Sequence, residues 1–193
     1  MAPYFTQHPI GALLFAVTVA AWVLPELWVR FRPAPDRVDR DRGTLWVFSG
    51  CLAAAWLVTA AASRLPLGAI AGQPIPFVIG LVVAWAGLVL RWSAFRALGR
   101  HFTVRVTTAA DQHVVTAGPY RALRHPGYTG LELFLVGAAL QFGNWIGVAA
   151  MLVLPMVGLV VRITVEERAL EEALGEQYRE FEATRKRMIP YVW

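Results

Sequence analysis

Long apolar runs constrain the fold of this chain more than any other feature. The run from Ile10 to Val29 has one charged residue, Glu26, and the run from Leu45 to Ala62 has none. Each approaches the roughly 20 residues that a helix needs to cross a bilayer. Hydrophobic residues make up 57% of the chain and charged residues 16%. This balance is typical of an integral membrane protein, so we assign both runs to transmembrane helices.

The second half of the chain continues the pattern with interruptions. A third apolar run begins at Phe77 and reaches Leu98 through a basic, aromatic end, and a fourth begins within Gly127 to Glu132 and ends near Phe142. A tight turn then leads to a fifth run from Ile146 to about Val165, followed by an amphipathic helix that extends to Glu182. We therefore expect an all-α polytopic membrane protein with about five transmembrane helices and an amphipathic C-terminal helix.

Arginine placement predicts the orientation of these helices. The loop from Arg30 to Gly43 and the long polar region from Arg91 to Arg124 are rich in arginine, whereas the turn at Gly143 contains no basic residue. Because cytoplasmic loops carry the excess of arginine and lysine, the N-terminus is expected outside and the C-terminus in the cytoplasm. We expect a single membrane domain over residues 1–193, in a prokaryotic cell membrane, with three transmembrane helices within residues 1–98.

Composition excludes several classes of protein. The net charge is +5, but the basic residues lie in short stretches between apolar runs, which argues against nucleic-acid binding. Cys51 is the only cysteine, so the chain has no intrachain disulfide. The four histidines lack the spacing of a metal site, and no metal is expected.

Two polar clusters could form a binding pocket on one side of the membrane. The segment from Gly118 to Gly130 contains two arginines, a histidine and two tyrosines between apolar runs. Arg162 and Glu166 lie four residues apart on the last transmembrane helix, so both side chains can face the same cavity. Together they would suit a polar, zwitterionic ligand. The alternatives are a connection whose arginines contact lipid headgroups, and an ordinary salt-bridged helix end.

These two clusters resemble a known family of membrane enzymes. The pattern Gly-Pro-Tyr-x-x-x-Arg-His-Pro-x-Tyr-x-Gly ends at Gly130 and is followed by Glu166-Glu167 and by Leu-Gly-Glu-Gln-Tyr ending at Tyr178. In this order the motifs resemble the isoprenylcysteine carboxyl methyltransferase family and the related phospholipid N-methyltransferases. The match extends from about Phe102 to Pro190.

The resemblance implies an S-adenosylmethionine-dependent methyltransferase whose cofactor-binding core lies within residues 99–193. Arg162 and Glu166 are the catalytic residues it implies, with Arg162 binding the substrate. The family often has histidine at the position of Gln112, whereas here the histidine is its neighbour, His113. The implied cofactor-binding residues are Gln112, His113, Val114, Val115, Tyr120, His125, Pro126, Gly127, Tyr128 and Glu166.

The implied acceptor is a lipophilic molecule that enters from the bilayer, most simply the carboxylate of an isoprenylcysteine-like compound. Such a carboxylate is already nucleophilic and needs no general base. An amine acceptor, as in phospholipid N-methylation, would need deprotonation, and Glu166, Glu167 or His125 would be the nearest candidates. A non-catalytic protein that binds membrane headgroups is a third hypothesis. Arg121 and Arg124 are left unassigned, with lipid headgroups as one contact open to them.

Overall fold

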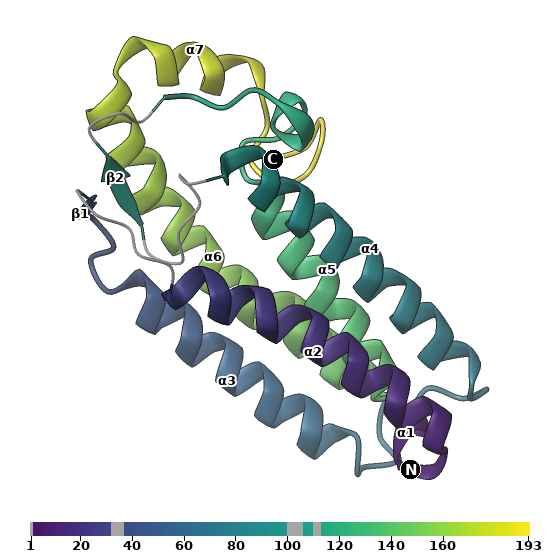
Figure 1. The fold of residues 1–193 in the computed structure, drawn as a ribbon. Coiled ribbons are helices and arrows are strands. Elements are labelled where there is room, and N and C mark those ends of the chain that lie inside the picture. Colours follow the sequence, from purple (N-terminus) through teal and green to yellow (C-terminus); the bar gives the residue numbers. More distant parts are fainter. Residues whose placement is uncertain (1, 32–36, 100–105, 110–112) are drawn as a thin grey trace.

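The structure, a computed structural model, describes residues 2–31, 37–99, 106–109 and 113–193, and these form a helical bundle with a polar cap at one end (Figure 1). The helices in chain order are α1 (Tyr4–Gln7), α2 (Pro9–Phe31), α3 (Thr44–Ala62), α4 (Ile75–Leu98), α5 (Pro126–Gln141), α6 (Trp145–Leu174) and α7 (Glu176–Thr184). A 3-10 turn, η2 (Gly118–Arg121), precedes α5. The short strands β1 (Arg37–Asp39) and β2 (Thr107–Ala109) pair antiparallel.

Four of the helices, α2, α3, α4 and α6, are long and apolar enough to cross a membrane. The predicted all-α polytopic fold is therefore confirmed. The fifth predicted helix is α5, which has only 16 residues and so falls short of a full span. Its flanking segments explain the short length, because Pro126 begins the helix and the turn at Gly143 follows its end.

Glycines bring α4 and α5 into close contact along their length. A Cβ atom added to Gly87 would lie 2.5 Å from the carbonyl oxygen of Gly130, and one added to Gly80 would lie 2.6 Å from that of Gly137. Real Cβ atoms do not approach backbone so closely, so only glycine fits at these crossing points. The backbones can then approach without large side chains between them, as is common between membrane helices.

The two ends of the bundle differ in character. The N-terminus, the α3–α4 connection and the turn before α6 lie at one end, while β1, β2, η2, α7 and the C-terminus gather at the other (Figure 1). At the first end Asn144 ties the connections together, since its side-chain nitrogen donates to the carbonyl oxygens of Ala62 and Leu67 at 2.8 and 2.9 Å. The described parts of the arginine-rich segments predicted to share one side of the membrane lie at the second end.

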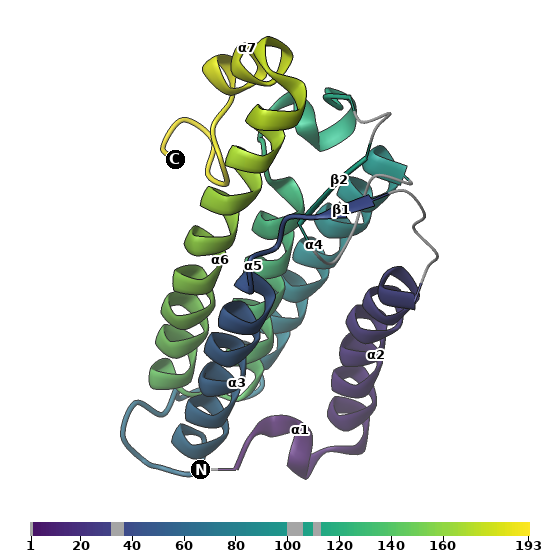
Figure 2. The same ribbon diagram turned by 90° about the vertical axis from the view of Figure 1, so that its left-hand side faces the viewer.

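Helix α2 lies at the edge of the bundle and is separated from α3 in Figure 2. It is linked to α4 by two polar contacts: the indole nitrogen of Trp85 donates to the hydroxyl of Thr18 at 3.0 Å, and Arg91 pairs with Glu26. The second contact lies near the polar end of both helices. Glu26 therefore belongs to an interhelical ion pair.

The predicted amphipathic C-terminal helix is divided in the structure. Helix α6 continues without a break from Trp145 to Leu174, and Gly175 then turns the chain with a φ of +56° before α7. The change of sequence pattern at Val165 does not end the helix, because the Glu, Ala and Leu residues that follow are strong helix formers. Gly175 ends it, since its backbone conformation is one that other residues rarely adopt.

Candidate functional site

Arg162 and Glu166 converge on the hydroxyl of Tyr128, which comes from the first turn of α5. The Nε atom of Arg162 donates to this hydroxyl at 2.8 Å, and the hydroxyl donates to Oε2 of Glu166 at 2.6 Å. The predicted pair therefore faces one cavity from adjacent turns of α6, together with a tyrosine of the Gly118–Gly130 motif. A cation, a hydroxyl and a carboxylate in series form a preorganised polar group within otherwise apolar helices.

Asp41 holds the other side of Arg162. Its Oδ1 atom accepts from Nη1 of Arg162 at 2.9 Å and from the Thr44 hydroxyl at 3.0 Å, and Oδ2 accepts from the amide of Leu45 at 3.0 Å. Burial opposes ionisation of Asp41, but the amides of Leu45 and Val106, the Thr44 hydroxyl and the Arg162 guanidinium together hold its pKa below the usual value. Asp41 is therefore an anion that fixes the guanidinium from the far side of the site.

A cavity extends from this polar group toward α7, and its walls are mainly aromatic and aliphatic. At the end of the cavity near α7, the side chains of Tyr120, Tyr178 and Phe181 form one buried cluster together with Ala94. Burial raises the pKa of both Tyr120 and Tyr178, so their hydroxyls stay neutral. The hydroxyl of Tyr178 is buried and has no hydrogen-bond partner among the described residues. The apolar lining residues of this end are Leu98, Val114, Val115, Leu170, Leu174 and Phe181.

The structure gathers most of the predicted cofactor-binding residues around this cavity. The residues of that set that line it are His113, Val114, Val115, Tyr120, His125, Gly127, Tyr128 and Glu166. Pro126 is buried at the start of α5 and does not line the cavity. Gln112 lies outside the described residues.

Sequence reasoning missed a second ion pair on the cavity wall. Arg91 is 6% exposed, its Nε atom pairs with Oε1 of Glu26, and its Nη1 atom donates to the carbonyl oxygen of Gly127 at 2.8 Å. The bond to Gly127 attaches α4 to the first turn of α5. Trp22, one turn before Glu26 on α2, also lines the cavity, and its indole nitrogen is buried without a partner among the residues described. The one sequence signal for this ion pair was Glu26, a charged residue within an apolar run.

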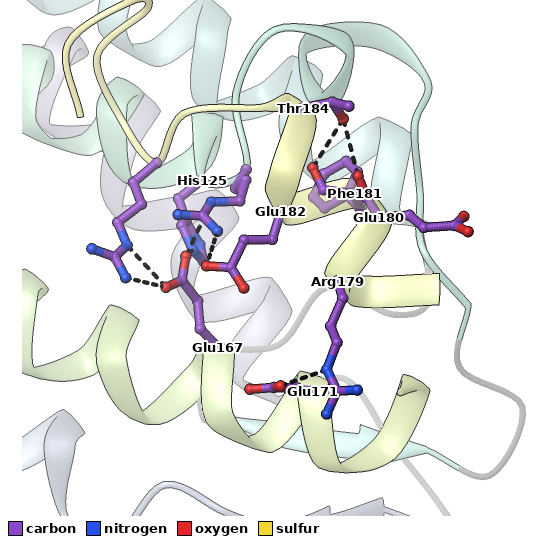
Figure 3. A network of polar contacts seen from close by, with 10 residues as sticks. His125, Glu167, Glu171, Arg179, Glu180, Phe181, Glu182 and Thr184 are labelled. Atoms are coloured by element: carbon purple, nitrogen blue, oxygen red, sulfur yellow. Dashed lines mark hydrogen bonds and ion pairs between the residues drawn. The ribbon is translucent and has the colours of Figure 1, made fainter. Parts of the chain in front are cut away.

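A buried cluster of charges lies directly behind the motif, around Glu167 (Figure 3). Oε1 of Glu167 is 3.0 Å from Nε2 of His125 and 3.2 Å from Nε of Arg124, and Oε2 accepts from Arg187 at 2.9 Å. Arg124 also pairs with Glu182 of α7. Arg124, which the sequence left unassigned, has a side chain that is only 8% exposed and lies beside two carboxylates of the protein itself. Arg121, in contrast, is exposed.

No group of three or more metal-ligating side chains occurs within residues 2–31, 37–99, 106–109 and 113–193. The cavity instead offers cationic, anionic and aromatic groups side by side. Such a set can hold an organic ligand that carries both signs of charge and a flat apolar ring.

Three comparisons place this chain among known proteins. Residues 75–177 match the family model described as phospholipid methyltransferase. The chain is 32% identical over 115 residues to protein-S-isoprenylcysteine O-methyltransferase B of Arabidopsis thaliana, with 58% of each chain covered. It is 30% identical over 116 residues to the protein-S-isoprenylcysteine O-methyltransferase of Tribolium castaneum, which covers 59% of this chain and 41% of that protein. The matched segment thus spans 58% of the length of the first relative and 41% of the length of the second.

A solved structure shares the fold. It is the structure of the eukaryotic intramembrane Ras methyltransferase ICMT, isoprenylcysteine carboxyl methyltransferase, with a TM-score of 0.61 and 24% sequence identity. The alignment covers 75% of this chain and 52% of that one. The family match spans more than half of the chain and includes α4, α5, α6 and the motif that lines the cavity. The chain is an integral membrane protein and belongs to the phospholipid methyltransferase family.

Proposed function

We propose that this chain transfers a methyl group from S-adenosylmethionine to a carboxylate on a lipophilic, isoprenylcysteine-like acceptor. One observation carries the proposal: Arg162, Tyr128 and Glu166 form a hydrogen-bonded series on the wall of a cavity that is otherwise largely aromatic and aliphatic. The relatives named as isoprenylcysteine O-methyltransferases support the reaction type.

The residues around the cavity fit the cofactor. Tyr120, Tyr178 and Phe181 offer ring faces for an adenine base, and the unpartnered Tyr178 hydroxyl offers a buried hydrogen-bonding group. Glu166 offers a carboxylate for the cationic part of the molecule. When bound, the cofactor supplies a methyl group activated by a positively charged sulfur, which becomes a neutral thioether once the methyl has left. Glu166 must therefore hold the cofactor without favouring its charged form too strongly over the transition state.

Arg162 would orient the acceptor carboxylate. Asp41 and Tyr128 already fix its guanidinium on two sides, so little side-chain entropy remains to be lost when an anion binds. A carboxylate is nucleophilic at neutral pH, so the protein has to align it and exclude water. Alignment alone can provide effective molarities of about 10⁵ M or more. Trp22 and Phe48, on the cavity wall toward α2 and α3, offer an apolar surface for the acceptor's hydrocarbon part.

The positive-inside rule supports a cytoplasmic location for the polar end of the bundle, which contains the candidate site. The cofactor would enter from the cytoplasm and the acceptor from the bilayer, with the N-terminus on the outer side. The prokaryotic cell membrane stays a prediction.

A second candidate is N-methylation of a phospholipid headgroup. Two carboxylates, Glu26 and Glu166, line the cavity together with the indole of Trp22, and carboxylates and an aromatic face suit a cationic amine. The description of the matched family also favours this reaction. However, an amine acceptor would have to meet three arginines, Arg91, Arg124 and Arg162, which line the same cavity.

One experiment separates these reactions. The purified protein, in lipid nanodiscs, is incubated with methyl-labelled S-adenosylmethionine and a lipid extract of its host, and the labelled product is identified by mass spectrometry. We expect a methyl ester, which mild base hydrolyses, whereas a base-stable methylated amine would establish the second candidate. A non-catalytic headgroup-binding protein predicts no labelled product and no heat of binding for S-adenosylhomocysteine in calorimetry.

A further inference from the structure

The last nine residues, Arg185–Trp193, form a strap that runs beside the Gly118–Gly130 motif. The amide of Arg124 donates to the carbonyl oxygen of Lys186 at 2.8 Å, and the amide of His125 donates to that of Arg187 at 2.9 Å. The hydroxyl of Thr129 donates to the carbonyl oxygen of Met188 at 2.8 Å. The backbone of the strap thus holds the segment that ends at the first turn of α5.

The strap is itself anchored to the bundle. Met188 is 1% exposed and packs in one cluster with Leu159 and Ile163 of α6. Its amide and that of Ile189 donate to the carbonyl oxygen of Trp193 at 2.9 and 2.8 Å, which closes the strap into a compact turn. The strap is therefore a fixed part of the fold.

The side chain of Arg187 joins the strap to Glu167 of α6. Its Nε and Nη2 atoms lie 2.9 and 2.8 Å from Oε2 of Glu167, and its guanidinium lies over the Trp193 ring at 5.5 Å. The other oxygen of Glu167 is 3.0 Å from Nε2 of His125, and Figure 3 shows these two side chains pointing toward each other. Because a carboxylate only accepts hydrogen bonds, Nε2 of His125 is the donor.

Adjacent glutamates on α6 therefore serve different partners. Successive residues of a helix point about 100° apart. Glu166 faces the cavity and accepts from Tyr128, whereas Glu167 faces the strap and accepts from His125 and Arg187. The ring of His125 stacks on that of Tyr128, with 5.6 Å between centroids. The strap is therefore connected to both partners of the Tyr128–Glu166 hydrogen bond: to Tyr128 through the ring of His125, and to Glu166 through its neighbour Glu167 on α6.

We propose that Arg187 is a positioning residue for the cofactor pocket: by holding Glu167 it fixes the His125 ring, and through that ring the side chain of Tyr128. The proposal rests on the proposed function, since it concerns the same cavity. Arg187 does not line that cavity, so its effect on a ligand passes through Glu167 and His125.

A pair of matched arginine variants tests the proposal. Arg187→Ala removes the strap contact, and Arg179→Ala removes an exposed arginine that pairs with Glu171 and Glu176 outside the cluster. We expect Arg187→Ala to weaken S-adenosylhomocysteine binding in calorimetry by about tenfold, because Glu167 would no longer hold the His125 ring, and with it Tyr128, in one position. Arg187→Lys keeps the charge and should recover part of this affinity, while Arg179→Ala should bind as the wild type does. Equal losses in Arg187→Ala and Arg179→Ala would overturn the proposal.

A second measurement reports on the His125 ring without any cofactor. Diethyl pyrocarbonate modifies accessible imidazoles, and mass spectrometry separates the peptides that contain His125 and His113. His125 is 6% exposed and bonded to Glu167, so it should react slowly in the wild type and faster in Arg187→Ala. His113 is exposed and should react alike in both.

The two measurements distinguish failure of this proposal from failure of the proposed function. If the wild type bound no S-adenosylhomocysteine, the proposed function would fail, and the rate of His125 modification would still decide whether Arg187 fixes the ring. If His125 stayed protected in Arg187→Ala, the positioning role would be wrong, whatever the affinity of the wild type for the cofactor product.

Discussion

The hydroxyl of Tyr128 donates a hydrogen bond of 2.6 Å to Oε2 of Glu166, a residue 38 positions later in the chain. The same hydroxyl accepts from Arg162, so one oxygen atom joins Arg162 and Glu166 of α6 to the first turn of α5. This arrangement brings the two motifs of the sequence into one site. It also makes the tyrosine hydroxyl the most direct test of that site.

Tyr128→Phe removes this oxygen and keeps the ring. Both charged neighbours lose a partner, and hydrogen bonds to charged groups contribute roughly 1.5 to 3 kcal/mol each. We expect S-adenosylhomocysteine affinity to fall at least about tenfold in calorimetry. Tyr191→Phe is the matched control, because Tyr191 is 96% exposed in the strap and should bind normally. Unchanged affinity in Tyr128→Phe would place the cofactor elsewhere in the cavity.

Glu166→Gln and Arg162→Lys should separate cofactor binding from acceptor binding. Glu166→Gln removes the negative charge at the cavity wall, so we expect a higher Kd for S-adenosylhomocysteine. Arg162→Lys keeps the positive charge but loses the planar group that can hold a carboxylate with two parallel bonds. It should raise the KM for the acceptor by about tenfold with little change in cofactor Kd. The reverse pattern would exchange the two assignments.

Arg162→Ala is a poor test of the acceptor role. It would leave Asp41, whose side chain is 5% exposed, without its cationic partner. Removing one member of a buried pair is strongly destabilising, so any loss of turnover could reflect loss of fold. The double variant Arg162→Ala with Asp41→Asn avoids the unpaired anion and should melt at a higher temperature than Arg162→Ala alone.

Asp41 should make stability depend on pH at the acid end. Its pKa in the folded protein lies below the usual value of 3.8, so folding favours the ionised form. The resulting stabilisation is fully present above about pH 4 and is lost as pH falls through the folded pKa. We expect the melting temperature of the wild type in detergent to exceed that of Asp41→Asn near pH 7, and the difference to shrink as the pH falls below about 4. A difference that stays constant down to pH 3 would show that the Asp41 charge does not contribute.

Local patterns in the sequence predicted much of this molecule. Long apolar runs predicted α2 and α3, and the spacing of Arg162 and Glu166 predicted that both side chains face one cavity. Each of these conclusions depends on residues within a few turns of one another. Hydrophobicity and helical periodicity act over that range, so the sequence displays them directly.

The remaining partners come from distant parts of the chain. Asp41 contacts Arg162 across 121 positions, and Glu26 contacts Arg91 across 65. Nothing local to Asp41 indicates this partner, because an aspartate just before a helix has a sufficient role in accepting from amides of the first turn. The sequence did not indicate that Glu167 bonds to both His125 and Arg187, because these two partners lie in separate segments of the chain. Tertiary packing determines these pairs, and one sequence does not display it.

The glycine contacts between α4 and α5 should limit stability more than any surface position. A Cβ atom at Gly87 would lie 2.5 Å from the carbonyl oxygen of Gly130 and 2.5 Å from the amide nitrogen of Phe134, so Gly87→Ala must push the two helices apart. We expect a loss of about 1 to 3 kcal/mol in unfolding free energy, the usual range for an overpacked core. Displacement of α5 should also weaken cofactor binding, because Gly127 and Tyr128 lie on its first turn.

Gly50→Ala is the matched control, since nothing lies within 4 Å of a Cβ atom there and alanine favours a helix. Thermal unfolding in detergent measures both variants: Gly50→Ala should melt at or above the wild-type temperature and Gly87→Ala well below it. Equal melting temperatures for the two variants would mean that α4 and α5 do not pack this closely.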